Sequence, residues 1–294
     1  MTGIAVTGAS RPVSAPLRPL PAGACDSHSH VFGPFDRFPL FAGRRYTPPL
    51  ATVEDYLSML DGIGADRGVL VHPSASGWDY RCTLNALSVS SGRLRGIVVV
   101  PPDVDEDTLQ SMHSCGIRGI RFTEPADGSP GTRVAGVLSL EDLRRFAPTL
   151  RALSWHAQIW ARCDAIVAAA HDLLRYDIPI VLDHMGFFDA DRGVHDATFR
   201  TFLSLLRDGP FWVKLSPCRV SKQRPDYIDA RPFHEALVRA APGRMLWGSD
   251  WPYIGLDACP PDVGAMVDVF DAFTQDDRLR HQIFVQNPKV LYGF

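Results

Sequence analysis

Short apolar runs alternate with longer segments of helical period from about residue 24 to the end of the chain. Most of these runs are β-branched or aromatic and are bounded by Gly, Pro or Asp, which is typical of buried parallel strands. The predicted strands are Ala24–His28, Arg67–His72, Gly96–Val100, Gly119–Phe122, Ala157–Trp160, Ile180–Asp183, Trp212–Leu215 and Met245–Trp247. The predicted helices between them are Val53–Ile63, Thr83–Ser91, Glu106–Cys115, Leu140–Leu153, Ala165–Tyr176, Ala197–Arg207, Pro232–Ala240 and Ala265–Phe273.

Eight alternations of strand and helix predict an α/β fold, a single (β/α)8 TIM barrel, for which about 250 residues is typical. Asp105 and Asp196 stand at the expected N-caps of two helices, and Gly64 and Gly116 stand at expected C-caps. The competing fold is a doubly wound open sheet. No Gly-x-Gly-x-x-Gly sequence or phosphate-binding loop follows an early strand, which argues against that sheet.

The chain is predicted to form a flexible N-terminal arm at residues 1–23 and one barrel domain at residues 24–294. Phe32–Pro49 and Ser216–Asp229 are extended rim loops after the first and seventh strands. In this fold, the loops on that rim build the active site. The final segment, Gln282–Phe294, is expected to form one more short helix that packs under the barrel.

Composition excludes several classes of protein. With 46% hydrophobic and 21% charged residues, the chain can bury a sizeable core. The net charge is −3, and no run of Lys or Arg marks a surface for nucleic acid. No apolar stretch approaches the ~20 residues that cross a membrane. The six cysteines are scattered and predict reduced thiols in a cytoplasmic protein; they are Cys25, Cys82, Cys115, Cys163, Cys218 and Cys259.

Two histidines near one end of the chain and an aspartate near the other carry the main chemical signal. His28 and His30 are two residues apart at the end of the first strand, so their imidazoles project to the same side. Asp250 directly follows the last strand, which neighbours the first strand in a closed barrel. His184 follows the sixth strand and opens onto the same rim. We therefore predict that Asp250, His28, His30 and His184 are the catalytic residues.

This set of side chains is compatible with two chemistries. Three imidazoles and one carboxylate can ligate one divalent metal ion, with zinc as the first choice, and leave a position open for water. The ligands would then be His28, His30, His184 and Asp250. Without a metal, Asp250 can act as general base while the imidazoles polarise a carbonyl group.

Other polar residues on the same rim are candidates for binding substrate. Arg121 ends the fourth strand and Arg219 lies in the loop after the seventh, and each guanidinium offers a planar fork to a carboxylate. Tyr46, Ser74 and Trp160 are expected to shape the site or to form hydrogen bonds with the substrate.

Three further polar residues lie in or beside predicted strands. Lys214 is expected to pair with a neighbouring acid. His156 begins its strand and is expected to have a structural role. His72 ends the second strand, and its role stays open.

The motifs, taken in order along the chain, resemble those of the amidohydrolase superfamily (amidohydrolase family 2). They are Asp26-Ser27-His28-Ser29-His30-Val31-Phe32-Gly33-Pro34, Gly119-Ile120-Arg121-Phe122, Asp183-His184-Met185-Gly186, Trp247-Gly248-Ser249-Asp250-Trp251-Pro252 and Asn287-Pro288. More narrowly, the chain resembles the lactonase branch typified by 2-pyrone-4,6-dicarboxylate lactonase, from about Ala22 onward.

The resemblance implies a barrel enzyme that opens a cyclic ester with water. In that branch the residues matching the four predicted catalytic residues surround the scissile carbonyl, the aspartate activates water, and no metal is bound. Relatives that act on sugar lactones use zinc held by a similar set. The Gly119–Phe122 strand lacks the bridging Lys or Glu of binuclear relatives, so no binuclear site is expected. Arg121, Arg219, Tyr46 and Ser74 fall where that branch holds substrate carboxylates.

The chain departs from this branch at two places. Its fourth strand is followed by Thr123-Glu124-Pro125-Ala126-Asp127-Gly128, where the branch has a further arginine, and Trp160 replaces a tyrosine. Losing a cation and gaining acids argues against a dicarboxylate held in the same way, because an unmatched charge in a closed site is costly. The predicted substrate is therefore a small lactone that carries a carboxylate or hydroxyls.

Three other functions remain open from the sequence, as does the oligomeric state. A metal-dependent non-oxidative decarboxylase would use a similar set of histidines and a late aspartate. A lactone isomerase would move the acyl group within the substrate and add no water. A binding protein without catalysis is disfavoured by the number of His, Asp and Arg residues on one rim.

Overall fold

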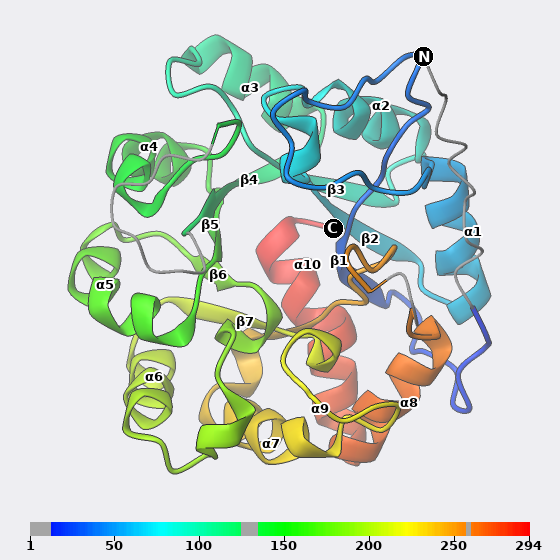
Figure 1. Ribbon diagram of the computed structural model, residues 1–294, viewed down its shortest axis with the longest axis vertical. Helices are drawn as coiled ribbons and strands as arrows, with labels where there is room; N and C mark the ends of the chain where they lie inside the picture. Colours follow the sequence, from blue (N-terminus) through cyan, green and yellow to red (C-terminus); the bar gives the residue numbers. More distant parts are fainter. Residues whose placement is uncertain (1–12, 125–134, 257–259) are drawn as a thin grey trace.

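The computed structural model describes residues 13–124, 135–256 and 260–294, and it shows one barrel of eight parallel strands in sequential order. Helices form a ring around these strands (Figure 1). The strands are β1 Cys25–Ser29, β2 Arg67–Val71, β3 Leu94–Val98, β4 Ile117–Thr123, β5 His156–Trp160, β6 Ile180–Leu182, β7 Phe211–Leu215 and β8 Met245–Trp247. The prediction of a single TIM barrel is confirmed.

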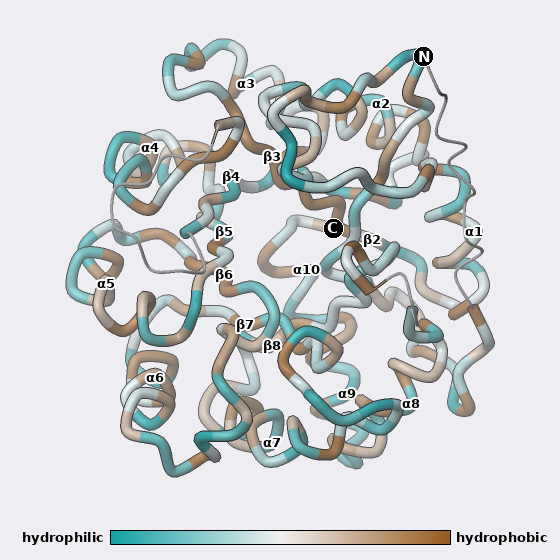
Figure 2. The backbone as a smooth tube through the Cα atoms, viewed as in Figure 1, coloured by the Kyte–Doolittle hydropathy of each residue, from teal (hydrophilic) through white to brown (hydrophobic). Residues whose placement is uncertain are grey.

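The helices of the ring follow the predicted segments closely. They are α1 Val53–Ile63, α2 Arg81–Val89, α3 Glu106–Ser114, α4 Leu140–Ala152, α5 Cys163–Arg175, α6 Ala197–Asp208, α7 Arg231–Ala240 and α8 Val263–Phe273. Along each of them hydrophobic and hydrophilic positions alternate, as amphipathic helices require (Figure 2). Their apolar faces pack on the outside of the strands and form the main core of the protein.

The predicted helix caps are present, with one shift. The Asp105 side chain accepts a hydrogen bond from Thr108 N–H at 2.6 Å, and Gly64 closes α1 with a φ of 76°. Asp196 caps α6 in the same way as Asp105 caps α3. The C-cap of α3 is Cys115 rather than Gly116, which follows it with a φ of 98°. Glycine at that position makes the left-handed turn without a Cβ penalty.

The last part of the chain packs under the barrel, as predicted, but it is not a single short helix. Helix α9 (Asp277–His281) continues through a π-helical turn at Gln282–Gln286 into α10 (Asn287–Tyr292). Pro288 has no N–H, so a regular α-helical hydrogen bond is missing where the turn widens. Leu291 and Tyr292 of α10 pack against the buried lower ends of the strands, and α10 is visible through the ring in Figure 1.

The rest of the described chain adds three observations. Residues 13–23 lie on the surface, where Ser14 bonds to Asp262 and Arg280 donates to the Pro19 carbonyl at 3.0 Å. The flexibility predicted for the arm stays a prediction, and residues 1–12 lie outside the described residues, as does Cys259. The other cysteines are free thiols. No helix in the described ranges has the length and hydrophobicity needed to cross a membrane.

Four buried histidines have strongly lowered pKa values because burial disfavours their charged form. The pKa is about 4 for His72 and His184 and about 3 for His156 and His234. In an unfolded chain these rings titrate near 6.5. Between pH 6.5 and about 4 the unfolded protein therefore binds more protons than the folded protein does.

We predict that the free energy of unfolding falls as the pH is lowered from 6.5 toward 4, by about 1.4 kcal/mol per pH unit for each such ring. Urea unfolding at several pH values measures this slope. His234 lies away from the rim, where its Nε2 is 2.7 Å from Thr274 Oγ1. His234→Leu should therefore remove the contribution of one ring, about 1.4 kcal/mol per pH unit, from the slope. His171→Leu, at a side chain that is 82% exposed, should leave the slope unchanged. An unaltered slope in His234→Leu would contradict the prediction.

Candidate active site

The two ends of the chain meet at the rim because the segment after β8 pairs with β1. The Asp250 N–H donates to the His28 carbonyl at 2.8 Å, and the His30 N–H donates to the Trp251 carbonyl at 2.8 Å. Gly248 permits this approach, since a Cβ there would lie 2.7 Å from the His28 Cβ. Asp250 itself has a φ of 64°, a left-handed conformation that concentrates at functional sites.

Asp26, two residues before His28 in β1, links β1 to the segment after β8 by hydrogen bonds. One carboxylate oxygen accepts from Ser249 N–H at 2.8 Å and from His28 N–H at 3.2 Å. The other accepts from the Ser249 hydroxyl at 2.6 Å and from the Tyr56 hydroxyl at 3.1 Å. Burial raises the pKa of Asp26 to about 6, although its hydrogen bonds oppose that shift. Asp26 thus holds the backbone at His28 and at Ser249, the residue before Asp250.

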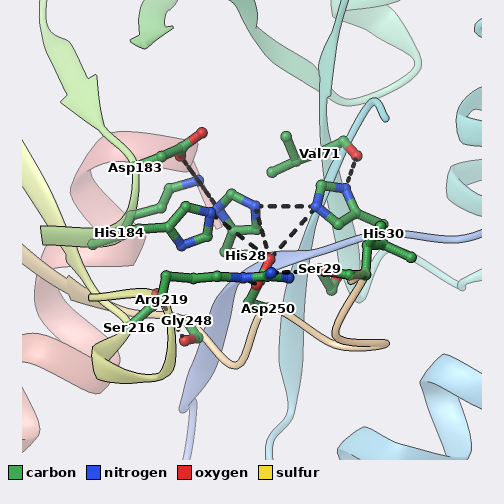
Figure 3. Close-up of polar contacts among 12 residues, drawn as sticks. His28, Ser29, His30, Val71, Asp183, His184, Ser216, Arg219, Gly248 and Asp250 are labelled. Carbon is green, nitrogen blue, oxygen red and sulfur yellow. Dashed lines mark hydrogen bonds and ion pairs between the residues drawn. The ribbon is translucent and has the colours of Figure 1, made fainter. Parts of the chain in front are cut away.

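Three imidazole nitrogens converge on one oxygen of Asp250 (Figure 3). Asp250 Oδ1 lies 3.5 Å from Nε2 of His28 and 3.6 Å from Nε2 of His30. Nε2 of His184 is 3.9 Å from the same oxygen. This oxygen has no hydrogen-bond partner among the described residues, although it is buried. The structure therefore brings the four predicted catalytic residues into one cluster.

Arg219 holds the second oxygen of Asp250. Its Nε donates to Asp250 Oδ2, and its Nη1 donates to the Ile254 carbonyl at 2.6 Å. Burial raises the pKa of Asp250, but the Arg219 guanidinium and the neighbouring imidazoles outweigh burial and hold it well below the usual range. The Asp250 carboxylate is thus ionised, and its basicity is reduced by its partner.

Arg121 is engaged in a similar way with Asp183. Its Nη2 donates to Asp183 Oδ2 at 3.0 Å, and its Nε is buried without a partner. In both pairs the carboxylate is the inner partner: Asp183 is 0% and Asp250 1% exposed, whereas Arg121 is 11% and Arg219 18% exposed. The two cations therefore form the outer layer that an incoming ligand meets first.

Lys214 lies in the barrel interior, fully buried, and pairs with an acid as the sequence predicts. Its Nζ is 3.6 Å from Asp183 Oδ1 and 3.3 Å from His28 Nδ1, and it donates to Gln158 Oε1 at 2.7 Å. Burial lowers the pKa of Lys214 to about 8, and Asp183 opposes that shift. Burial also lowers the pKa of His28 well below its ordinary value, helped by Lys214, so His28 is neutral at pH 7.

The remaining candidates line the rim. Burial raises the pKa of Tyr46, and a hydrogen bond with Ser74 opposes that rise, so these two residues lie together. Trp160 meets Phe187 edge to face at 5.0 Å, and Phe187 meets the His184 ring at 5.1 Å. His72 forms a structural hydrogen bond, with its Nε2 2.9 Å from the Gly77 carbonyl oxygen.

The acidic stretch after β4 is described only in part. Glu124 Oε1 accepts from Leu140 N–H at 2.7 Å, so this carboxylate caps α4 and is not directed at a substrate. Pro125–Gly128 lies outside the described residues. One of the two acids of this stretch therefore has a structural partner, and the loss of a cation stays a prediction.

The candidate residues can be tested as metal ligands on this geometry. A ligand atom of His28, His30 and Asp250 each lies within 4.8 Å of the others, a spacing that suits one ion. An imidazole ligates through a lone pair. His30 has one on Nε2, because its Nδ1–H donates to the Val71 carbonyl at 2.7 Å. His28 has no lone pair on Nε2 if its Nδ1 accepts from the Lys214 ammonium 3.3 Å away, because the ring proton is then on Nε2. In this arrangement the cluster does not fit a metal ion.

The sequence patterns found the convergent histidines and Asp250 but assigned no role to Asp26 or Asp183. Both belong to motifs that contain a catalytic candidate, and both are buried acids within or beside apolar strands. A carboxylate in such a position needs a partner, and that need is the signal that marks them. Which partner each one takes depends on contacts across the barrel.

Comparison with known proteins places the chain in a family. The amidohydrolase family model matches residues 25–294. A 4-sulfomuconolactone hydrolase of Rhizobium radiobacter is 36% identical over 99% of this chain and 97% of that protein. A 2-pyrone-4,6-dicarboxylate hydrolase of Comamonas testosteroni is 32% identical over 95% of this chain and 93% of that protein.

Solved structures agree with these relatives. A putative 2-pyrone-4,6-dicarboxylic acid hydrolase of Pseudomonas putida superposes with a TM-score of 0.79 at 31% identity, covering 93% of this chain and 98% of that one. A probable enzyme of the same name from Acinetobacter baumannii, with citric acid bound, has a TM-score of 0.79 at 28% identity, covering 92% and 100%. The predicted resemblance to the lactonase branch is confirmed, and the chain belongs to the amidohydrolase family.

Proposed function

We propose that this protein hydrolyses a small anionic lactone, with Asp250 as the general base. The observation that carries the proposal is the buried Asp250 Oδ1, which lies between three imidazole nitrogens and has no hydrogen-bond partner in the part of the chain that the structure describes. A water molecule and a substrate carbonyl placed at that point would supply the missing donor and an acceptor. The relatives named above as lactone hydrolases support this reaction class.

The reaction follows from the roles of these side chains. Asp250 Oδ1 takes a proton from water while the water oxygen bonds to the carbonyl carbon and the carbonyl π electrons move to oxygen. His28, through its Nε2–H, and His184 stabilise the oxyanion. When the oxyanion collapses, the ring C–O bond breaks, and the leaving alkoxide takes the proton from Asp250. The product is the open-chain hydroxy acid.

The arrangement of charge supports an anionic substrate. Arg121 and Arg219 lie outside the carboxylates they pair with, so a substrate carboxylate or sulfonate meets cations before it meets acids. Each guanidinium keeps N–H groups that are not used by its carboxylate partner. A substrate anion that shares Arg219 would also weaken its hold on Asp250, which would make that carboxylate a stronger base.

Replacing the base should abolish turnover without unfolding the protein. For Asp250→Asn we expect kcat on an anionic lactone to fall by about 10²–10⁴-fold, because the amide cannot accept the proton of water. Steady-state hydrolysis against a lactone panel measures the effect, and the melting temperature checks the fold. Asp177→Asn, at a side chain that is 91% exposed, is the matched control. Hydrolysis near the wild-type rate in Asp250→Asn would exclude this mechanism.

Removing the Arg219 charge should lower kcat/KM more for anionic lactones than for neutral lactones. For Arg219→Gln we expect kcat/KM on a carboxylated lactone to fall by about 10–100-fold, since a charge-assisted hydrogen bond contributes about 1.5–3 kcal/mol. For an uncharged lactone of the same ring size the change should be smaller than about 3-fold, because Asp250 is released from its partner. Arg151→Gln, outside the site, is the control. Equal losses on both lactones would show that Arg219 only maintains the structure.

Product analysis separates hydrolysis from the alternative reactions. Hydrolysis adds one water and gives a hydroxy acid, whereas an isomerase keeps the mass of the lactone. A decarboxylase releases carbon dioxide. Mass spectrometry and NMR of the product, with the reaction run in 18O-labelled water, distinguish these outcomes, and unlabelled product would contradict the proposed function.

A further inference from the structure

Lys214 makes contacts that pairing with an acid does not explain. Asp183 already receives the Arg121 guanidinium on Oδ2 at 3.0 Å, so its charge is neutralised without a second cation. Lys214 is nevertheless 0% exposed, and burying an ammonium group is costly unless its donors are used. Its three N–H groups face Gln158 Oε1, His28 Nδ1 and Asp183 Oδ1.

The contact with His28 has only one possible direction. An ammonium group donates hydrogen bonds and accepts none, so His28 Nδ1, 3.3 Å away, must be the acceptor. The neutral His28 ring then carries its proton on Nε2. Asp183 Oδ1 lies 3.2 Å from the same nitrogen and is the competing partner, and a hydrogen bond to it would need the ring proton on Nδ1.

The direction of hydrogen-bond donation can be followed from His28 to His30. His28 Nε2 lies 3.3 Å from His30 Nε2. His30 Nδ1 is 2.7 Å from the Val71 carbonyl, which only accepts, so the neutral His30 ring carries its proton on Nδ1 and a lone pair on Nε2. His28 therefore donates to His30. The four groups form one directed chain, from the Lys214 ammonium through both imidazoles to a backbone carbonyl.

We propose that Lys214 is a positioning residue that holds the ring proton of His28 on Nε2. The His28 Nε2–H, which donates to His30 in this structure, is then the donor that an oxyanion formed at this point would take over. A metal ion at this cluster would need a lone pair on that nitrogen, and the displaced proton would face the Lys214 ammonium. Lys214 thereby disfavours a metal ion and favours a hydrogen-bonded oxyanion. The donor role rests on the proposed hydrolysis, whereas the position of the proton does not.

The position of the proton can be measured directly by NMR of 15N-labelled histidine in the wild-type protein, with the His28 signal identified by its absence in His28→Gln. We expect a protonated Nε2 and an unprotonated Nδ1. In Lys214→Met, which keeps the chain length and removes the donor, the proton should move to Nδ1. An Nδ1-protonated His28 in the wild-type protein would overturn the proposal, even if the variant fails to fold.

Two further readouts test the consequences of that proton position. In Lys214→Met we expect kcat on an anionic lactone to fall by about 10²–10³-fold, as when one oxyanion donor is lost, with KM changed by less than about 3-fold. Bound zinc after dialysis against zinc should rise toward one ion per chain in the variant and stay below that in the wild type. Lys289→Met, at an exposed lysine of α10 under the barrel, should match the wild type in both.

The outcomes separate the two proposals. If no lactone is hydrolysed but the His28 proton moves in Lys214→Met as expected, the proposed function fails and the role of Lys214 stands. If hydrolysis is found and the wild type binds zinc as tightly as Lys214→Met does, the role of Lys214 in disfavouring a metal is wrong. A parallel loss of kcat and rise of KM in Lys214→Met, with the proton unmoved, would reduce Lys214 to a structural residue.

Discussion

The geometry of this site depends on the hydrogen bonds that the buried Asp26 carboxylate accepts across the seam between β1 and β8. Two of its hydrogen bonds come from Ser249, one from His28 and one from Tyr56. Ser249 directly precedes Asp250, so Asp26 fixes the positions of Asp250 and His28 at the same time. Catalytic groups need to be held within about 0.5 Å, and a carboxylate that accepts from two backbone N–H groups and two side-chain hydroxyls supplies that precision.

Buried charge is arranged here in a consistent order from the interior to the rim. Lys214, Asp183 and Asp250 are fully buried, and Arg121 and Arg219 are the most exposed members. Each carboxylate is therefore neutralised before a ligand arrives, and burial lowers the pKa values of His28 and His184, so these two rings stay neutral. This order leaves positive charge facing the side from which an anion would approach.

Strand and helix positions were predictable from the sequence because each depends on local periodicity. The match is within about two residues for most elements, and the convergence of His28 and His30 follows from the two-residue repeat of a strand. The contact between Lys214 and His28 joins residues 186 apart in the chain and crosses the barrel interior, so no local pattern contains it. The same holds for the Arg219–Asp250 pair, whose partners sit on loops after different strands. The terminal helix was misjudged because the π-helical turn before Pro288 has no hydrophobic signature.

Two cations, Arg219 and Lys214, contact the cluster of imidazoles around Asp250. Each of them affects a different group of that cluster. The Arg219 guanidinium stabilises the ionised form of Asp250 and so lowers its basicity, and under the proposed function a substrate anion that shares the guanidinium would reduce this effect. Lys214 changes no charge on His28 but decides which nitrogen carries the ring proton. One cation is partly exposed and can respond to a ligand, whereas the other is sealed in the barrel and cannot. Under the proposed function, the arginine would therefore respond to substrate, and the lysine would fix the orientation of the hydrogen-bond donors.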